Sequence, residues 1–218
     1  MKKVIIFDFD NTLVLSLPYW KEMIDHKTAE HYGVPENPEF EPRRHGYSNK
    51  DTAKMFLDMH GVDDSVDNLI KYWYDYMAIK YRDDIKFVNG AKEALEYLKA
   101  RGYKLVLATA TGKSLLDIAL EVFDIERYFD YIICEEMVGK SKKDPDIYHK
   151  IMKELGADSS ECFYFEDSYI ATKTAVSLGI DCCAIISDLN QKREDDFAKI
   201  CKGLSREYSK ELFEKLGL

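Results

Sequence analysis

The sequence predicts an α/β fold, in which a Rossmann-like parallel sheet is covered by helices on both faces and carries an inserted α-helical cap domain. Short continuous apolar runs recur along the chain, and helical patterns separate the later ones. Such runs are typical of strands buried on both faces, and their alternation with helices indicates right-handed βαβ units. Residues 17–86 interrupt the alternation, which indicates an insert.

The strands are predicted from the apolar runs, and the helices from the spacing of apolar residues between them. The runs lie at residues 4–7, 103–108, 131–134, 162–165 and 182–186. Gly102 and Gly156 follow two of the helical stripes as stop signals. The stripes consist of Ala91, Ala94, Leu95 and Leu98, of Leu116, Ala119, Leu120 and Phe123, and of Tyr148, Ile151, Met152 and Leu155.

The inserted segment has helical patterns and no convincing buried strand, and we interpret its Trp73 as a core residue. We therefore predict a core domain made of residues 1–16 and 87–218 and a cap domain made of residues 17–86. The chain crosses between them near Ser16 and again near residues 87–90, and both crossings are expected to act as hinges. The charged tail at residues 191–218 has a helical pattern, with Tyr208, Leu212 and Leu216 on one stripe, and is expected to pack on the flank of the sheet.

The composition excludes several classes of function. The chain has 218 residues and a net charge of −9, which gives no general attraction for nucleic acid or for anionic lipid. No apolar run approaches the length of a membrane span. The five cysteines form no CxxC pair, which favours reduced thiols in a cytoplasmic protein. The sequence leaves the oligomeric state open, and a monomer fits it.

Polar residues follow four of the predicted strands. They are Asp8 and Asp10, then Thr109, then a loop carrying Lys140, Lys142 and Lys143, and finally Glu166 and Asp167. In a parallel sheet, ligands bind outside the carboxyl ends of the strands. The predicted fold therefore brings carboxylates, a hydroxyl and a lysine to one edge of the sheet.

This combination suits the transfer of a phosphoryl group. A carboxylate can attack a phosphate dianion only if positive charge offsets their repulsion, and Mg2+ with carboxylate ligands supplies that charge. Asp8 would attack phosphorus and form an aspartyl-phosphate, and Asp10 would move protons. Asp8 and Asp167 would hold the metal, and a lysine would add fixed positive charge.

Each residue taken alone also has a structural interpretation. An Asp after a buried strand is usually a turn or helix-cap residue, and an Asp-Ser pair is most often an N-cap. One lysine among 31 basic residues carries no information by itself. The functional interpretation depends on their coincidence at successive strand ends.

The chain resembles the haloacid dehalogenase-like hydrolase superfamily, in the helical-cap branch that contains β-phosphoglucomutase and phosphoglycolate phosphatase-like proteins. Residues 8–12 read DFDNT and match the first motif of that family, DxDx(T/V). The second motif matches the strand that ends in Thr109, and the fourth matches Glu166 and Asp167. The third is a lysine followed by x-x-Pro-Asp, and that register selects Lys142. The resemblance covers the chain up to about Leu189.

The resemblance implies a role for each residue. Asp8 would be the nucleophile and a metal ligand, and Asp10 the general acid and base, with its backbone carbonyl also on Mg2+. Asp167 would bind the metal directly, with Glu166 close by or acting through water. Phosphate would be held by Lys142, by Thr109, and by the backbone N–H groups near Asn11 and Ala110.

The resemblance leaves alternatives for the reaction. β-Phosphoglucomutases usually carry His and Arg where Trp20 and Asn49 stand here, and these side chains serve the second phosphate of the mutase cycle. Arg43 and Arg44 are candidates to replace them, and the predicted substrate-specificity residues are Trp20, Arg43, Arg44 and Asn49. We therefore favour a phosphatase of small phosphorylated metabolites over a phosphomutase, and either of these over a non-catalytic regulatory protein.

Overall fold

A computed structural model of the chain describes residues 2–44 and 47–218. Among these residues, six strands form one parallel sheet in the order β3-β2-β1-β4-β5-β6. The strands are β1 (Val4–Phe7), β2 (Lys104–Thr109), β3 (Tyr131–Cys134), β4 (Cys162–Glu166), β5 (Asp181–Ile185) and β6 (Gly203–Ser205). The chain adds β2 and β3 on one side of β1 and the later strands on the other, so the topology switches at β1. This sheet, with helices around it, confirms the predicted α/β fold.

Helices cover both faces of the sheet. Alternate residues of β1 divide between two apolar cores: Ile5 and Phe7 face one, and Val4 and Ile6 face the other. The first core includes residues of α6 (Ala91–Ala100), α7 (Lys113–Phe123) and α11 (Lys210–Leu216), and the second includes residues of α8 (Asp146–Leu155) and α9 (Tyr169–Ser177). A short helix, α10 (Glu194–Ala198), packs near β6.

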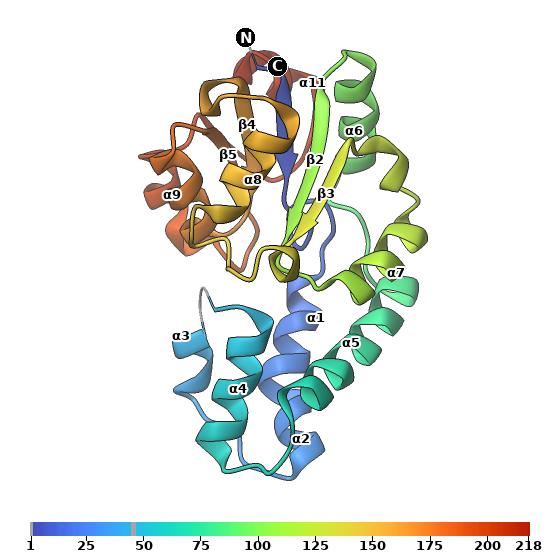
Figure 1. Ribbon diagram of the computed structural model, residues 1–218, viewed down its shortest axis with the longest axis vertical. Helices are drawn as coiled ribbons and strands as arrows, with labels where there is room; N and C mark the ends of the chain where they lie inside the picture. The colour runs from blue at the N-terminus through green and yellow to red at the C-terminus, as the bar shows by residue number, and fades with distance from the viewer. Residues whose placement is uncertain (1, 45–46) are drawn as a thin grey trace.

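The segment predicted as the cap is helical. Its helices are α1 (Leu17–Lys21), η1 (Glu22–Lys27), α2 (Thr28–Tyr32), α3 (Phe40–Arg44), α4 (Asn49–His60) and α5 (Val66–Asp83). Most of them lie below the sheet in Figure 1, and α5 runs up toward α7 and contacts it. Trp73 of α5 is fully buried and donates from its indole nitrogen to Thr28 at 2.8 Å. The division at residues 16 and 87 into two domains stays a prediction.

The two chain crossings lie side by side. Leu15 donates its N–H to the carbonyl of Lys86 at 2.8 Å, and Val88 donates to the carbonyl of Leu13 at 2.9 Å. Val14 forms an antiparallel bridge with Phe87 between these two bonds. Any movement of the helical segment relative to the sheet therefore bends a two-stranded connection rather than a single chain.

The tail differs from the helical prediction. Residues Gly203–Ser205 form the edge strand β6, and Tyr208 lies before α11 instead of within it. The Tyr208 ring packs on Phe7 and Phe165, and its hydroxyl donates to the carbonyl of Thr12 at 3.2 Å. The sequence pattern misses β6 because three residues at a sheet edge carry no apolar run of useful length. The tail thus buttresses the strands that carry the candidate site.

Gly90 marks the place where the tail meets the second crossing. Its φ is +74°, and a Cβ there would lie 2.2 Å from the carbonyl oxygen of Tyr208. We expect Gly90→Ala to lower the free energy of unfolding by about 2 kcal/mol or more, since it combines left-handed strain with a backbone clash. Gly61→Ala is the matched control: its φ is +60° with no atom within 4 Å, so only the conformational cost of about 1 kcal/mol remains. Urea unfolding of both variants measures the difference, and equal losses would contradict the clash.

No helix in the described part of the chain is both long and apolar enough to cross a membrane. The cytoplasmic location stays a prediction. The cysteines of the described residues are free thiols, and Cys201 is the most exposed of them.

Candidate active site

Asp8 and Lys142 form a buried ion pair at the carboxyl edge of the sheet. Asp8 directly follows β1, and its Oδ1 lies 2.5 Å from Nζ of Lys142, 134 residues further along the chain. The two residues are 4% and 6% exposed, so water screens the pair weakly. Lys140 and Lys143, which lie beside Lys142 in sequence, are exposed.

Several groups hold Lys142 in this position. Its Nζ lies 2.8 Å from Glu166 and 3.3 Å from the hydroxyl of Tyr164, and Tyr164 also donates to Glu166. Its backbone N–H donates to the carboxylate of Glu135 at 2.7 Å, and its carbonyl accepts from Tyr148 at 3.2 Å. The loop from β3 to α8 is thus anchored at both the side chain and the backbone of Lys142.

Three carboxylates cluster around this lysine. One oxygen each from Asp8, Glu166 and Asp167 lies within 4.8 Å of the others. Glu166 is saturated, because its second oxygen accepts from the N–H groups of Asp167 and Ser168 at 3.1 and 2.9 Å. Asn11 donates to Oδ2 of Asp167 at 2.9 Å. Among the described residues, Oδ2 of Asp8 and Oδ1 of Asp167 accept no hydrogen bond, so each has an oxygen available for a ligand.

Ionisation of all three carboxylates would give the cluster more negative than positive charge. Burial, together with the neighbouring Glu166, raises the pKa of Asp8 to about 8, although Lys142 acts in the opposite direction. Burial and Glu166 also raise the pKa of Asp167 well above its ordinary value. Burial alone would lower the pKa of Lys142, but Asp8 and Glu166 outweigh it, so the lysine stays charged. One ammonium therefore cannot neutralise three carboxylates here.

The donor set fits a hard divalent cation. All its ligand atoms are carboxylate oxygens, which Mg2+ prefers over nitrogen and sulfur ligands. The excess negative charge would be offset by such an ion, and the free oxygens of Asp8 and Asp167 are available to it. Glu166, whose oxygens are already used, would act from beside the ion.

The predicted phosphate-binding residues follow β1 and β2, although the N–H of Asn11 itself already has a partner within the protein. Thr109 ends β2 and is fully buried, and its Oγ1 accepts from the N–H of Thr111 at 3.0 Å, which leaves its own proton to donate. Ala110 follows it and is half-buried. The N–H of Asn11 instead donates to the carbonyl of Val14 at 2.6 Å, because Asn11 turns the loop in a left-handed conformation with φ of 62°. Its side chain supports Asp167.

Asp10 occupies a separate position at the junction of the sheet and the helical segment. Its Oδ1 accepts from Ser16 at 2.6 Å and from the indole N–H of Trp20 at 3.1 Å. The hydroxyl of Tyr81 also donates to Oδ1, at 2.5 Å, and Thr111 donates to Oδ2 at 2.5 Å. Asp10 is half-buried and is not one of the three clustered carboxylates.

The predicted specificity residues are mostly engaged with protein groups. Trp20 is 7% exposed and bonds Asp10 rather than lining an open cleft. Asn49 begins α4 and hydrogen-bonds the hydroxyl of Tyr74, which accepts from the N–H of Gly112 at 3.1 Å. Arg43 is exposed and pairs with Glu39 at 3.1 Å, one helical turn away. The side chain of Arg44 lies outside the part of the chain that the structure describes.

Other supporting residues were not predicted from the sequence. Asn190 donates to the carbonyl of Asp167 at 2.9 Å, and Ser187 accepts from Asn11 at 3.0 Å. Both follow β5, the next strand end beyond the four that carry the predicted site residues. The rule that selected Asp8 and Thr109 would therefore have found them if it had been applied to one more strand.

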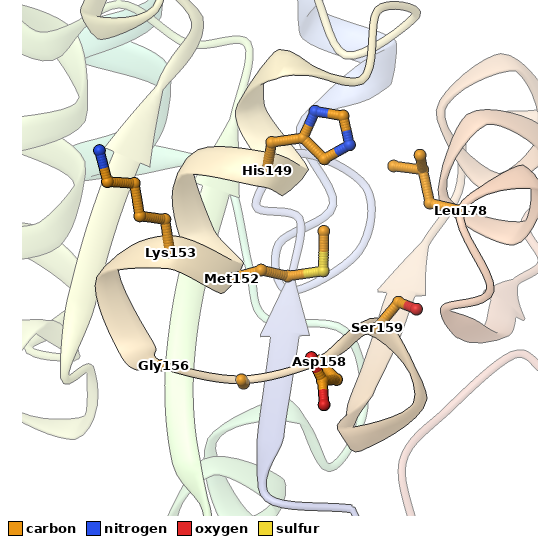
Figure 2. A pocket seen from close by; sticks show the side chains of 8 residues that line it. His149, Met152, Lys153, Gly156, Asp158, Ser159 and Leu178 are labelled. Carbon is orange, nitrogen blue, oxygen red and sulfur yellow. The ribbon is translucent and has the colours of Figure 1, made fainter.

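A surface pocket on the opposite edge of the sheet is unrelated to this chemistry. Figure 2 shows its side chains, among them His149, Met152 and Lys153 of α8 and Asp158 and Ser159 before β4. They lie at the amino ends of the strands, whereas Asp8 and Asp167 follow the carboxyl ends. Ligands of parallel α/β sheets bind at the carboxyl ends.

The fold and these strand-end residues define a hydrolase site of the α/β type. The chain belongs to the haloacid dehalogenase-like hydrolase family, whose sequence model matches residues 5–185. That match covers all four strand ends with their carboxylates and lysine. It stops at the end of β5, so β6 and α11 lie outside it.

Curated relatives and solved structures agree with this family. The chain is 29% identical over 179 residues to a phosphorylated carbohydrates phosphatase of Thermotoga maritima, covering 82% of each chain. It is 26% identical over 200 residues to a phosphoglycolate phosphatase of Pseudomonas syringae pv. syringae, covering 88% of this chain and 72% of the relative. The crystal structure of CbbY from Rhodobacter sphaeroides in complex with phosphate has the same fold, with a TM-score of 0.83 at 21% identity and full coverage of both chains.

Proposed function

We propose that the chain is a Mg2+-dependent phosphatase that hydrolyses small phosphorylated metabolites, such as sugar phosphates or similar monoesters, through an aspartyl-phosphate on Asp8. The contact that carries this proposal is the 2.5 Å pair between Asp8 and Lys142, set within a cluster of buried carboxylates at the carboxyl edge of the sheet. The phosphatase names of the relatives support the same reaction class.

The side chains would divide the reaction into two displacements. The free oxygen of Asp8 attacks phosphorus while Lys142 offsets the charge of both anions. As the bond from phosphorus to the alcohol oxygen breaks, Asp10 donates a proton to that oxygen. Asp10 then takes a proton from the water that attacks the aspartyl-phosphate, which restores Asp8 and releases phosphate. A bound Mg2+ supplies positive charge that lowers the repulsion between carboxylate and phosphate.

Water is favoured as the final acceptor over a second sugar hydroxyl. A phosphomutase must also hold a second phosphate, and the residues at the expected positions are already engaged. Trp20 bonds Asp10, Asn49 bonds Tyr74, and Arg43 pairs with Glu39. We further propose that residues 17–86 act as a cap that selects the substrate, with residues 1–16 and 87–218 as the core.

A screen of phosphorylated metabolites with Mg2+ tests this function. We expect release of inorganic phosphate from at least one sugar phosphate or similar monoester, a complete stop on addition of EDTA, and recovery when Mg2+ is restored in excess. The assay scores isomerised product separately from free phosphate. Isomerisation without phosphate release would establish a mutase instead, and activity that survives EDTA would contradict the metal role.

A further inference from the structure

Asp10 is held by an unusual number of donors for one carboxylate. Four side chains donate to it: Ser16, Trp20 and Tyr81 bind Oδ1, and Thr111 binds Oδ2. The two oxygens are thus unequal, because Oδ1 is crowded by three donors while Oδ2 has one.

Two of these donors come from the helical segment and have buried side chains. Tyr81 lies on α5 and is 1% exposed, with its ring against Phe9 and Phe123. Trp20 lies on α1, and its ring meets Tyr74 edge-on. The indole nitrogen of Trp20 is a donor only, and the Tyr81 hydroxyl faces an acceptor and keeps its proton near neutral pH. Both groups therefore fix Oδ1 as an acceptor.

A proton-transferring carboxyl must present one oxygen at hydrogen-bond reach of the reacting oxygen. With Oδ1 saturated, Oδ2 is the atom that can carry the proton, and Thr111 is a single hydroxyl that can turn away. The direction in which Oδ2 points follows from how Oδ1 is held. Trp20 and Tyr81 bind Oδ1 from the helical segment. The direction of Oδ2 therefore depends on the position of that segment relative to the sheet.

We propose that Trp20 and Tyr81 are positioning residues for Asp10, which hold Oδ1 so that Oδ2 delivers the proton to the leaving oxygen. This role rests on the proposed phosphatase function. The proton goes from Oδ2 of Asp10 to the alcohol oxygen as its bond to phosphorus breaks, which leaves Asp10 ionised and Asp8 phosphorylated. Loss of either donor leaves substrate binding and the attack by Asp8 intact and impairs this proton transfer.

The test compares substrates that differ in their need for a proton. An alkyl phosphate must be protonated as it leaves, whereas p-nitrophenyl phosphate leaves readily as the phenolate anion. The value of kcat/KM reports steps up to release of the leaving group. We expect Tyr81→Phe and Trp20→Phe to lower kcat/KM for the alkyl phosphate by roughly ten-fold to 10²-fold, within the contribution of a general acid. For p-nitrophenyl phosphate the change should stay within about two-fold, with KM for both substrates little altered.

Tyr72→Phe is the matched control, because Tyr72 lies on the same helix as Tyr81 and its hydroxyl donates to the carbonyl of Lys27, at 3.5 Å, and not to Asp10. It should leave both substrates unchanged. Equal losses on both substrates, or none, in variants that unfold at the wild-type temperature would overturn the positioning role and leave the phosphatase proposal standing. Should Tyr81→Phe fail to fold, Trp20→Phe alone decides. A wild-type protein that releases phosphate from neither substrate would overturn both proposals.

Discussion

Asp8→Asn is expected to abolish phosphate release, with a loss of roughly 10⁴-fold or more in kcat. The amide has the shape of the carboxylate but lacks the charge that attacks phosphorus. Lys142 keeps its contact with Glu166 at 2.8 Å in this variant, so the loop that carries it stays anchored. Steady-state release of phosphate with Mg2+ measures the effect. Asp58→Asn is the control, because Asp58 forms an exposed ion pair with Lys54 on α4, and this variant should retain full activity. Retained turnover in Asp8→Asn would rule out Asp8 as the nucleophile.

The same variant is expected to be at least as stable as the wild type when metal is removed. Burial and Glu166 raise the pKa of Asp8 to about 8, so the folded protein favours the neutral carboxyl. That contribution to stability is present at acid pH, below the unfolded pKa of ~3.9, and is lost as the pH rises through the folded value. Asn does not ionise. In EDTA, the difference in unfolding midpoint temperature between Asp8→Asn and the wild type should therefore increase in favour of the variant as the pH rises from about 4 to about 8. A gap that stays constant over this range would contradict the raised pKa.

Sequence patterns predict the sheet well because buried strands leave a local signal. The run Val4–Phe7 is apolar without interruption, and the strand occupies those residues. The strand ends then bring Asp8 and Lys142 together by topology alone, since parallel strands deliver their carboxyl ends to one edge. Family motifs add the choice of Lys142 over its neighbours, which no periodicity could make.

The surroundings of Asp10 could not be predicted in this way. The bonds from Tyr81 and Thr111 to Asp10 span 71 and 101 residues, and no local pattern links such pairs. A tyrosine in an apolar helix is predicted as core, and Tyr81 is indeed buried. What the pattern omits is the hydroxyl, because periodicity reports which face is buried and not which polar atom a buried side chain meets. The bond from Trp20 to Asp10 is hidden from the sequence for the same reason.

Lys142→Met is expected to reduce kcat by roughly 10³-fold and to destabilise the protein by ~3–5 kcal/mol in EDTA. Methionine fills a similar volume, but it removes the one cation that contacts Asp8 and Glu166 among the residues that the structure describes. Glu166 then remains without its counter-charge in a buried site, beside Asp8 and Asp167. Lys143→Met is the control, because that neighbouring lysine is exposed and its ammonium lies over the ring of Tyr47, away from the clustered carboxylates. Urea unfolding and the phosphate assay measure the two effects.

The two partners of this ion pair thus have opposite effects on stability, which a double-mutant cycle can isolate. Removal of the Asp8 carboxylate removes its repulsion with Glu166. Removal of the Lys142 ammonium leaves that repulsion without a positive charge to offset it. In the double variant of Asp8→Asn with Lys142→Met, one negative charge leaves together with the cation. Beyond what Asp8→Asn alone adds to stability, we expect the double variant to recover at least about 1 kcal/mol of the loss caused by Lys142→Met, while activity stays absent. Additive stabilities would contradict the coupling of Asp8 to Lys142. A Lys142→Met protein as stable as the wild type would show that the carboxylates are neutral without it, and would remove the electrostatic case for a divalent cation at this site.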